Sequence, residues 1–302
     1  MEMNFTKSTY TVALLIVGLD LSLTSHDALA GTWTTLDMPG QTDTWLYGID
    51  GNNIVGGYYF SGILYNGTTW TSLNMPGAEW TMVQGINGNN LVGAYEDASG
   101  NTHGFLYNGT TWTSLNMPGA QASGGTFIAG IQGNTLVGMY RVASGLCNGF
   151  VYNGTTWTTL NMPGAYETQI NGISGNDLVG WYSNASGTHG FLYNGSTWIT
   201  LDMPGAVQTE LWSISGNNFV GWFKDSSGTP HACLSDGTTW IQLDAPGANG
   251  TAAYGIDGSD IVGSYSDASG EEGFLYVIPE PSLSAILGIG FLSAAVLRRR
   301  QR

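Results

Sequence analysis

The sequence predicts an all-β fold, a six-bladed β-propeller with four strands in each blade. Two observations lead to this prediction. The composition favours strands and tight turns over helices, and three sequence blocks recur six times at a period near 42 residues. A third observation, the phase at which the repeats begin and end, indicates that they close into a ring.

The composition limits which secondary-structure elements the chain can form. Only 10% of the 302 residues are charged, against roughly 25% in an average soluble protein. Glycine is abundant, with 46 residues, and there are 11 tryptophans and 15 tyrosines. Glycine and aromatic residues, with few Lys, Glu and Arg, favour strands joined by short turns.

The repeat is defined by three blocks that follow one another along the chain. One block is anchored by a tryptophan in Thr-Trp-x-x-Leu-x-Met-Pro-Gly-Ala, at spacings of 37, 42, 45, 41 and 42 residues. The second block is Gly-Ile-x-Gly-Asn-x-Leu/Val-Val-Gly, and the third is (His)-Gly-Phe-Leu-Tyr-Asn-Gly. The six anchors are Trp33, Trp70, Trp112, Trp157, Trp198 and Trp240. We expect these tryptophans to pack in the core between blades.

Each repeat provides four short strands separated by turn signals. The residues leading into Gly-Ile form the first strand, and Leu-Val-Gly-x-Tyr forms the second. Gly-Phe-Leu-Tyr forms the third and Thr-Trp-Thr-Ser-Leu the fourth. Asn-Gly between the third and fourth strands predicts a type I′ hairpin turn, and Gly-Asn-Asn is expected to serve the same purpose between the first two. Met-Pro-Gly-Ala predicts a type II turn that links one repeat to the next.

The ends of the repeat region indicate ring closure. It begins with a fourth strand, around Trp33, and ends with a third strand, at Tyr276. In a ring the N-terminal strand completes the last blade, whereas a solenoid gains nothing from this permutation and needs capping units. Glycines at the corresponding position of five first strands fit a crowded propeller axis. They are Gly48, Gly85, Gly130, Gly172 and Gly255.

The two ends of the chain predict export. Residues 1–30 have the pattern of a signal peptide, with Lys7, an apolar stretch and a small-x-small site at Ala28-Leu29-Ala30. Residues 31–277 form the propeller. Residues 278–302 contain a Pro-Glu-Pro motif, then 16 apolar residues that would span about 24 Å as a transmembrane helix, and then an arginine cluster. The sorting residues are Pro279, Glu280, Pro281, Arg298, Arg299 and Arg300.

The tail resembles the PEP-CTERM sorting signal of Gram-negative bacteria, which has the same three parts in the same order. The resemblance implies that an exosortase-type enzyme processes the tail. The protein would then be held briefly in the inner membrane before reaching the cell surface or the extracellular space. The tail does not bear on the function of the body.

The repeats resemble extracellular HAF repeats, which are named for His-Ala-Phe. His231-Ala232 matches the first two letters, whereas His103-Gly104-Phe105 and His189-Gly190-Phe191 differ in the middle one. The resemblance implies an extracellular setting and little about chemistry.

Charge and residue types exclude several functions. Between Gly31 and Val277 the only cations are Arg141 and Lys224, against 18 Asp and Glu, so nucleic-acid binding is excluded. Cys147 and Cys233 lie in different repeats, which does not imply a disulfide. The body histidines occupy equivalent positions in three blades and should therefore lie apart. We predict no catalytic residue, no metal site and no cofactor.

The candidate binding residues lie where the repeat is irregular, in loops that should share one face of the propeller. Aromatic and carboxylate side chains together suit carbohydrate, since an aromatic face stacks on a sugar ring; solvated loop residues are the alternative. These residues are Asp43, Trp45, Glu79, Trp80, Tyr166, Glu167 and Glu210.

The sequence thus favours a non-enzymatic surface or matrix protein that binds exopolysaccharide. A carbohydrate-active enzyme that uses paired carboxylates is the first alternative. Ice binding by the repeated threonines is a minor alternative, because a propeller spreads its threonines around a ring.

Overall fold

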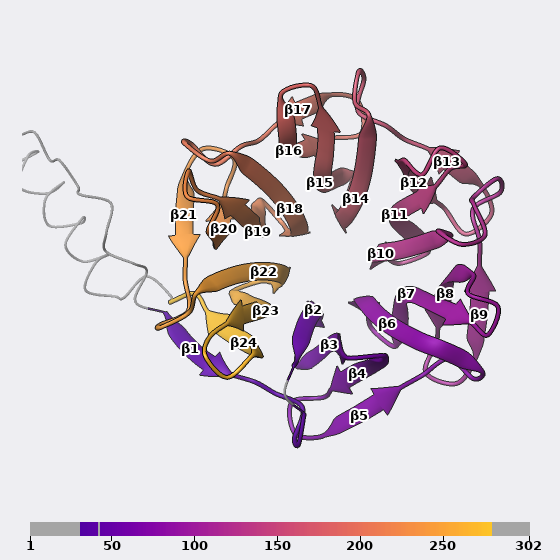
Figure 1. Ribbon diagram of the computed structural model, residues 1–302, viewed down its shortest axis with the longest axis horizontal. Helices are drawn as coiled ribbons and strands as arrows, with labels where there is room; N and C mark the ends of the chain where they lie inside the picture. The colour runs from indigo at the N-terminus through magenta and orange to yellow at the C-terminus, as the bar shows by residue number, and fades with distance from the viewer. Residues whose placement is uncertain (1–30, 42, 280–302) are drawn as a thin grey trace, which may run out of the picture.

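The computed structural model describes residues 31–41 and 43–279, and it confirms the six-bladed propeller. Six four-stranded antiparallel sheets are arranged in a ring around a central axis (Figure 1). The described residues contain strands and turns and no helix. The expected signal peptide and the Glu280–Arg302 part of the expected tail lie outside them. No helix in the described ranges is long and apolar enough to cross a membrane.

Blades 1 to 5 follow chain order from the axis outwards (Figure 1). Blade 1 comprises β2 (Trp45–Asp50), β3 (Asn53–Tyr58), β4 (Ser61–Tyr65) and β5 (Trp70–Leu73). Blade 2 comprises β6 (Ala78–Asn87), β7 (Asn90–Asp97), β8 (Thr102–Tyr107) and β9 (Trp112–Leu115). Blade 3 comprises β10 (Thr126–Gln132), β11 (Thr135–Arg141), β12 (Cys147–Tyr152) and β13 (Trp157–Thr159).

The other three blades repeat this order. Blade 4 comprises β14 (Glu167–Ser174), β15 (Asp177–Asn184), β16 (Gly187–Tyr193) and β17 (Trp198–Thr200). Blade 5 comprises β18 (Gln208–Ser215), β19 (Asn218–Lys224), β20 (Pro230–Ser235) and β21 (Trp240–Leu243). Blade 6 comprises β22 (Gly250–Asp257), β23 (Asp260–Ser266), β24 (Glu271–Val277) and, from the N-terminus, β1 (Thr32–Thr35).

The ring closes as the phase of the repeats predicts. Strand β1 pairs antiparallel with β24, with Trp33 opposite Tyr276. Just beyond β1 the Leu36 amide donates to the Gly273 carbonyl at 2.8 Å. Segments more than 230 residues apart therefore form one blade.

The turns confirm one sequence prediction and correct another. In the Met-Pro-Gly turns the glycine has positive φ, for example +78° at Gly40, and the Gln41 amide donates to the Met38 carbonyl, as a type II turn requires.

The Asn-Gly loops are not type I′ turns, because glycine alone has positive φ in them. Instead, Asn66 Oδ1 accepts the amides of Thr68 and Thr69 and closes a four-residue loop. The Gly51 loop between the first two strands likewise has positive φ only at glycine, so it too is not type I′.

The glycines of the first strands lie where neighbouring blades touch at the axis. A Cβ atom on Gly130 would lie 2.8 Å from the Asn171 carbonyl oxygen of the next blade. Equivalent contacts follow around the ring, and Ser213 takes this position in blade 5. Close backbone packing therefore sets the diameter of the ring, as expected from the sequence.

Apolar residues of adjacent blades share each core cluster. Val262 of blade 6 packs with Leu46, Ile54 and Ile63 of blade 1, and each is at most 3% exposed. The repeat tryptophans are half-buried at the margin of these clusters. Each packs mainly on aromatic rings of its own blade, such as Tyr107, whose ring centroid is 4.4 Å from that of Trp112. The expected packing between blades is thus shared with packing inside the blade.

A buried threonine anchors each turn between blades. The Met162 amide donates to Thr168 Oγ1 at 3.1 Å, and the same bond recurs in every blade. The threonines are Thr44, Thr81, Thr126, Thr168, Thr209 and Thr251. This device fixes the start of each first strand and so positions the loops described next.

Candidate functional site

One face of the ring, here called the upper face, is where the first strand of each blade begins. Loops from the fourth to the first strand meet there with loops between the second and third strands, as the sequence analysis expects. The Thr81 amide, for example, donates to the Phe60 carbonyl of the neighbouring blade at 3.0 Å. The irregular residues therefore stand on a regular hydrogen-bonded frame.

A pocket of about 400 Å³ opens on the upper face at blades 1 to 3; we call it the aromatic pocket. Its walls come from the first strands of the three blades and from the loop between β3 and β4. The side chains that define it are Trp45, Tyr47, Tyr59, Phe60, Trp80, Met82 and Phe127. Its size lies in the range of small-molecule sites, and aromatic walls are typical of them.

The rings of the aromatic pocket are held by neighbouring strands and by one strained loop. Trp80 of β6 stacks on Phe127 of β10, with centroids 6.4 Å apart and planes at 23°. Tyr59 has φ of +44° and is the one non-glycine residue with positive φ among the described residues. This conformation costs roughly 1–2 kcal/mol. Tyr59 and its neighbour Phe60 are both strongly exposed, at 61% and 71%. Backbone strain of this kind clusters at ligand sites.

The structure brings two of the seven sequence-predicted residues together. Trp45 and Trp80 line the aromatic pocket, whereas the other five do not. Glu79 is exposed on β6 beside the pocket strand. The backbone of Asp43 forms an isolated parallel β-bridge with that of Glu271 in blade 6.

The remaining three candidates lie in blades 4 and 5. Tyr166 is 59% exposed, and Glu167 accepts the Cys147 amide at 3.2 Å. Glu210 of β18 accepts a hydrogen bond from Gln208 Nε2 at 2.7 Å. The seven residues therefore do not form one cluster.

Tyr47, Tyr59, Phe60, Met82 and Phe127 line the aromatic pocket but are not among the residues predicted from the sequence. A signal was present, because Tyr58-Tyr59-Phe60 interrupts the second-to-third-strand loop that elsewhere consists mainly of Asp, Asn, Ser and Gly. Phe127 lies inside a regular first strand, and only the stacking with Trp80 reveals its place in the pocket.

Carboxyl groups on the blade 5 and 6 side of the upper face are shifted by their surroundings. Burial raises the pKa of Glu210 to about 7, although Gln208, Trp212 and Lys224 oppose the shift. Burial also raises the pKa of Glu271, and the charge of Asp43 adds to this effect. Raised carboxyl pKa values favour the protonated form, which donates a hydrogen bond.

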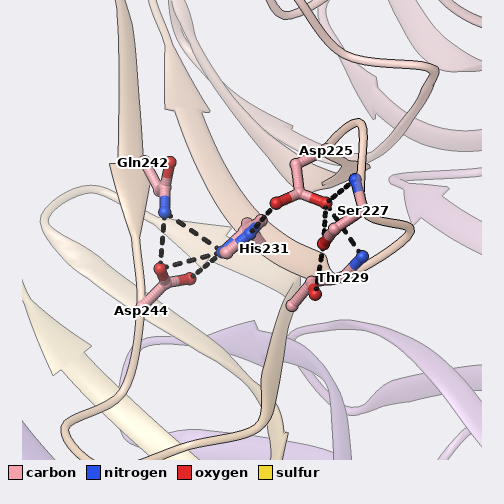
Figure 2. Close-up of polar contacts among 6 residues, drawn as sticks. All are labelled: Asp225, Ser227, Thr229, His231, Gln242 and Asp244. Atoms are coloured by element: carbon pink, nitrogen blue, oxygen red, sulfur yellow. Dashed lines mark hydrogen bonds and ion pairs between the residues drawn. The ribbon is translucent and has the colours of Figure 1, made fainter.

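Histidines at equivalent positions of the third strands connect the preceding loop with the end of the fourth strand in blades 2, 4 and 5. Figure 2 shows His231 of β20 between two carboxylates, with Nδ1 2.9 Å from Asp244 and Nε2 3.5 Å from Asp225. Ser227 and the Thr229 amide hold Asp225, and its pKa is lowered to about 2, chiefly by the Ser227 hydroxyl.

The histidines lie in three separate sheets, as the sequence analysis expects, and each joins a turn to a strand end. In blade 4, His189 contacts Ser186 Oγ and Asp202 Oδ2, both at 2.8 Å. No group of three or more His, Cys, Asp or Glu with metal-binding geometry occurs among the described residues.

The repeated threonines lie in separate loops at the outer strands of the ring. Thr68 and Thr69 both hydrogen-bond to Asn66 Oδ1, and the corresponding loops of blades 2 to 5 use an Asn or Asp side chain in the same way. These threonines thus serve turn formation in a ring, not in one flat array.

Comparison with known proteins identifies the fold and no family. No protein-family model matches the chain, and no curated protein matches it. The SapL1 lectin, solved in complex with alpha-methyl fucoside, is 13% identical, with a TM-score of 0.51, over 80% of this chain and 98% of the lectin. Identity this low shows a shared fold alone.

Two further solved structures share the fold. A Trypanosoma rangeli sialidase, in complex with a difluoro-KDN compound, is 10% identical with a TM-score of 0.52. That match covers 83% of this chain but 59% of the sialidase. TolB from Acinetobacter baumannii is 10% identical with a TM-score of 0.51, over 78% of this chain and 63% of TolB.

Proposed function

We propose that this chain is an exported, non-catalytic propeller that binds polysaccharide through the aromatic pocket. The observation that carries the proposal is the convergence of Trp45, Tyr59, Phe60, Trp80 and Phe127 on one pocket of the upper face. Aromatic faces give flat apolar platforms that match the C–H faces of sugar rings. A row of such faces on a rigid scaffold suits a sugar ligand at low entropic cost.

Fold likeness gives limited further support. The SapL1 structure contains alpha-methyl fucoside, and the sialidase structure contains 2,3-difluoro-KDN, so propellers of this fold hold sugar compounds in those proteins. At 13% and 10% identity no residue is carried over to this chain.

The cellular setting in this proposal comes from the two ends of the sequence. A signal peptide directs export, and an exosortase-type enzyme processes the PEP-CTERM-like tail after a stay in the inner membrane. The protein then acts at the cell surface or in the extracellular matrix. Membrane retention should fall when the enzyme is co-expressed and should be restored by Pro279→Ala with Pro281→Ala. Retention that is insensitive to both changes would contradict this setting.

A carbohydrate-active enzyme is the second candidate, and Glu210 is the observation that favours it. A half-buried carboxyl with a pKa of about 7 suits a general acid. Turnover on a polysaccharide panel that is abolished by Glu210→Gln would establish this candidate over the binding protein.

Polysaccharide binding is tested by measuring affinity for a glycan and polysaccharide panel with the purified propeller. Trp45→Ala combined with Trp80→Ala should abolish binding while the far-UV circular dichroism stays unchanged. Leu146→Ala is the matched control, because Leu146 is an exposed apolar residue of the corresponding loop of blade 3 and lines none of the described pockets. Binding that survives the double substitution would remove the aromatic pocket as the site.

A further inference from the structure

A second pocket of about 280 Å³ lies on the upper face between blades 5 and 6; we call it the polar pocket. Its apolar walls are Trp222, Pro230 and the rings of Tyr254 and Tyr265. Ser264 and Glu271 supply hydroxyl and carboxyl oxygen atoms, and Lys224 supplies an ammonium group. An aromatic wall beside donors and acceptors is the combination that fixes the orientation of a hydroxyl-rich ligand.

Lys224 is placed to donate to a ligand. Its Nζ lies over the Trp222 ring, 5.5 Å from the centroid. The ion pairs of the described residues all involve histidine, so Lys224 takes part in none of them, although its charge opposes the rise in the pKa of Glu210. A cation held over an indole face keeps its position while its N–H groups stay available.

The two pockets share a wall near the propeller axis. Tyr47 lines the aromatic pocket and Tyr254 lines the polar pocket. The two rings pack against each other with centroids 5.3 Å apart, and both residues also line a pocket at the propeller axis that the first strands of the blades surround. Trp212 packs edge-on against Tyr254 at 4.9 Å and supports it from blade 5. The wall is therefore a fixed aromatic ridge between two openings on one face.

We propose that a single polysaccharide chain crosses this ridge, with one segment in the aromatic pocket and another in the polar pocket. The inference rests on the proposed function and specifies the ligand as the interior of a linear chain, not a terminal sugar. Each pocket alone is small, whereas two joined subsites gain from effective concentration. The acidic body, with two cations against 18 carboxylates, repels polyanions, so the chain is a neutral polysaccharide.

Length dependence tests this inference. Neutral polysaccharides are assayed first, and the best binder is hydrolysed to fragments of graded length for calorimetric titration. The fragment that first reaches both pockets should bind about 100-fold or more tightly than the short ones. Trp222→Ala and Lys224→Gln should each remove that gain and leave the affinity for short fragments unchanged. Lys224→Gln is included because it replaces only the polar end of a partly exposed side chain and keeps the fold.

The outcomes separate this inference from the proposed function. If no neutral polysaccharide binds, or if charged polymers bind better, the crossing chain is excluded. If binding occurs through Trp45 and Trp80 but does not vary with length, or is unchanged in both polar-pocket variants, the proposed function stands and the second subsite is wrong.

Discussion

Asp37 and Glu272 place two carboxyl groups against each other where the segment after β1 meets β24 and the ring closes. Burial and this second carboxyl raise the pKa of Asp37 to about 7, against the opposing bond from the Gly273 amide at 2.8 Å. In the other five blades the two corresponding side chains form a hydrogen bond between a donor and an acceptor. Those pairs are Ser61–Asn74, His103–Asn116, Asn148–Asn161, His189–Asp202 and His231–Asp244.

The closing seam should therefore weaken as pH rises. The folded-state pKa of Asp37 lies above its unfolded value of 3.8, so between these values the folded chain binds more protons. The stabilisation that comes from the protonated Asp37 is fully present below pH 4 and is lost as pH rises through 7. Allowing for solvent screening at a partly exposed pair, we expect a loss on the order of 1–2 kcal/mol. Urea unfolding at a series of pH values measures it.

Two substitutions isolate this effect. Asp37→Asn copies the residue of blades 1 to 3, and Glu272→His copies the His–Asp pair of blades 4 and 5. Both should raise the free energy of unfolding above pH 7 relative to the unaltered chain, with a smaller gain at pH 5. An identical difference at both pH values would show that the carboxyl pair is not the cause.

Glu210 should show the same sign of pH dependence at a separate place. Its pKa of about 7 in the folded state, raised by burial, exceeds the unfolded value, so its ionisation above pH 7 opposes folding. Glu210→Gln should stabilise the chain at pH 8 and change little at pH 5, as measured by thermal unfolding. Equal stability of the two chains at pH 8 would show that the carboxylate is solvated.

The buried threonine of each interblade turn should contribute measurably to stability. Thr168→Val keeps the shape of the side chain but leaves the Met162 amide without its acceptor. The expected loss is about 1–3 kcal/mol in urea unfolding. Thr158→Val on β13 is the control, because Thr158 is exposed, and it should change stability by less than about 0.5 kcal/mol. Equal effects of the two substitutions would contradict the role of the bond.

The axial glycines should not tolerate a side chain. In Gly130→Ala the new methyl group would meet the Asn171 carbonyl oxygen at 2.8 Å and Val137 Cγ2 at 2.9 Å. Because one contact is backbone of the next blade, the ring must widen locally, and we expect a loss of about 1–3 kcal/mol. Ser213→Gly in blade 5 should be tolerated much better, and thermal unfolding compares the two.

The fold could be predicted because the same strand and turn signals recur in six repeats. Turn residues, the block order and the phase of Trp33 and Tyr276 identify the strands, the blades and the closing seam. The Asn-Gly turn type was wrong because the side chain of Asn66 competes with the backbone for the loop amides. A local pattern of residue types does not show which of these hydrogen bonds prevails.

The candidate site was predictable only in part. Irregular residues identified Trp45 and Trp80, and the structure places both in the aromatic pocket. Phe127 and Met82 were missed because they occupy regular strand positions, where a side chain facing the pocket looks like any half-buried strand residue. Tyr166 and Glu167 do not line this pocket, because irregular residues occur in the loops of several blades and irregularity alone does not show which side chains meet.

The decisive test of binding in the aromatic pocket is the affinity of Phe60→Ala for the polysaccharide that the unaltered chain binds. Phe60 is 71% exposed, so its removal should leave the fold and melting temperature unchanged while it removes one wall of the aromatic pocket. We predict that calorimetric affinity falls about 10-fold or more for Phe60→Ala and stays unchanged for Leu146→Ala, a difference of at least about 1.4 kcal/mol. Equal affinities of the two variants would show that the aromatic pocket is not the binding site.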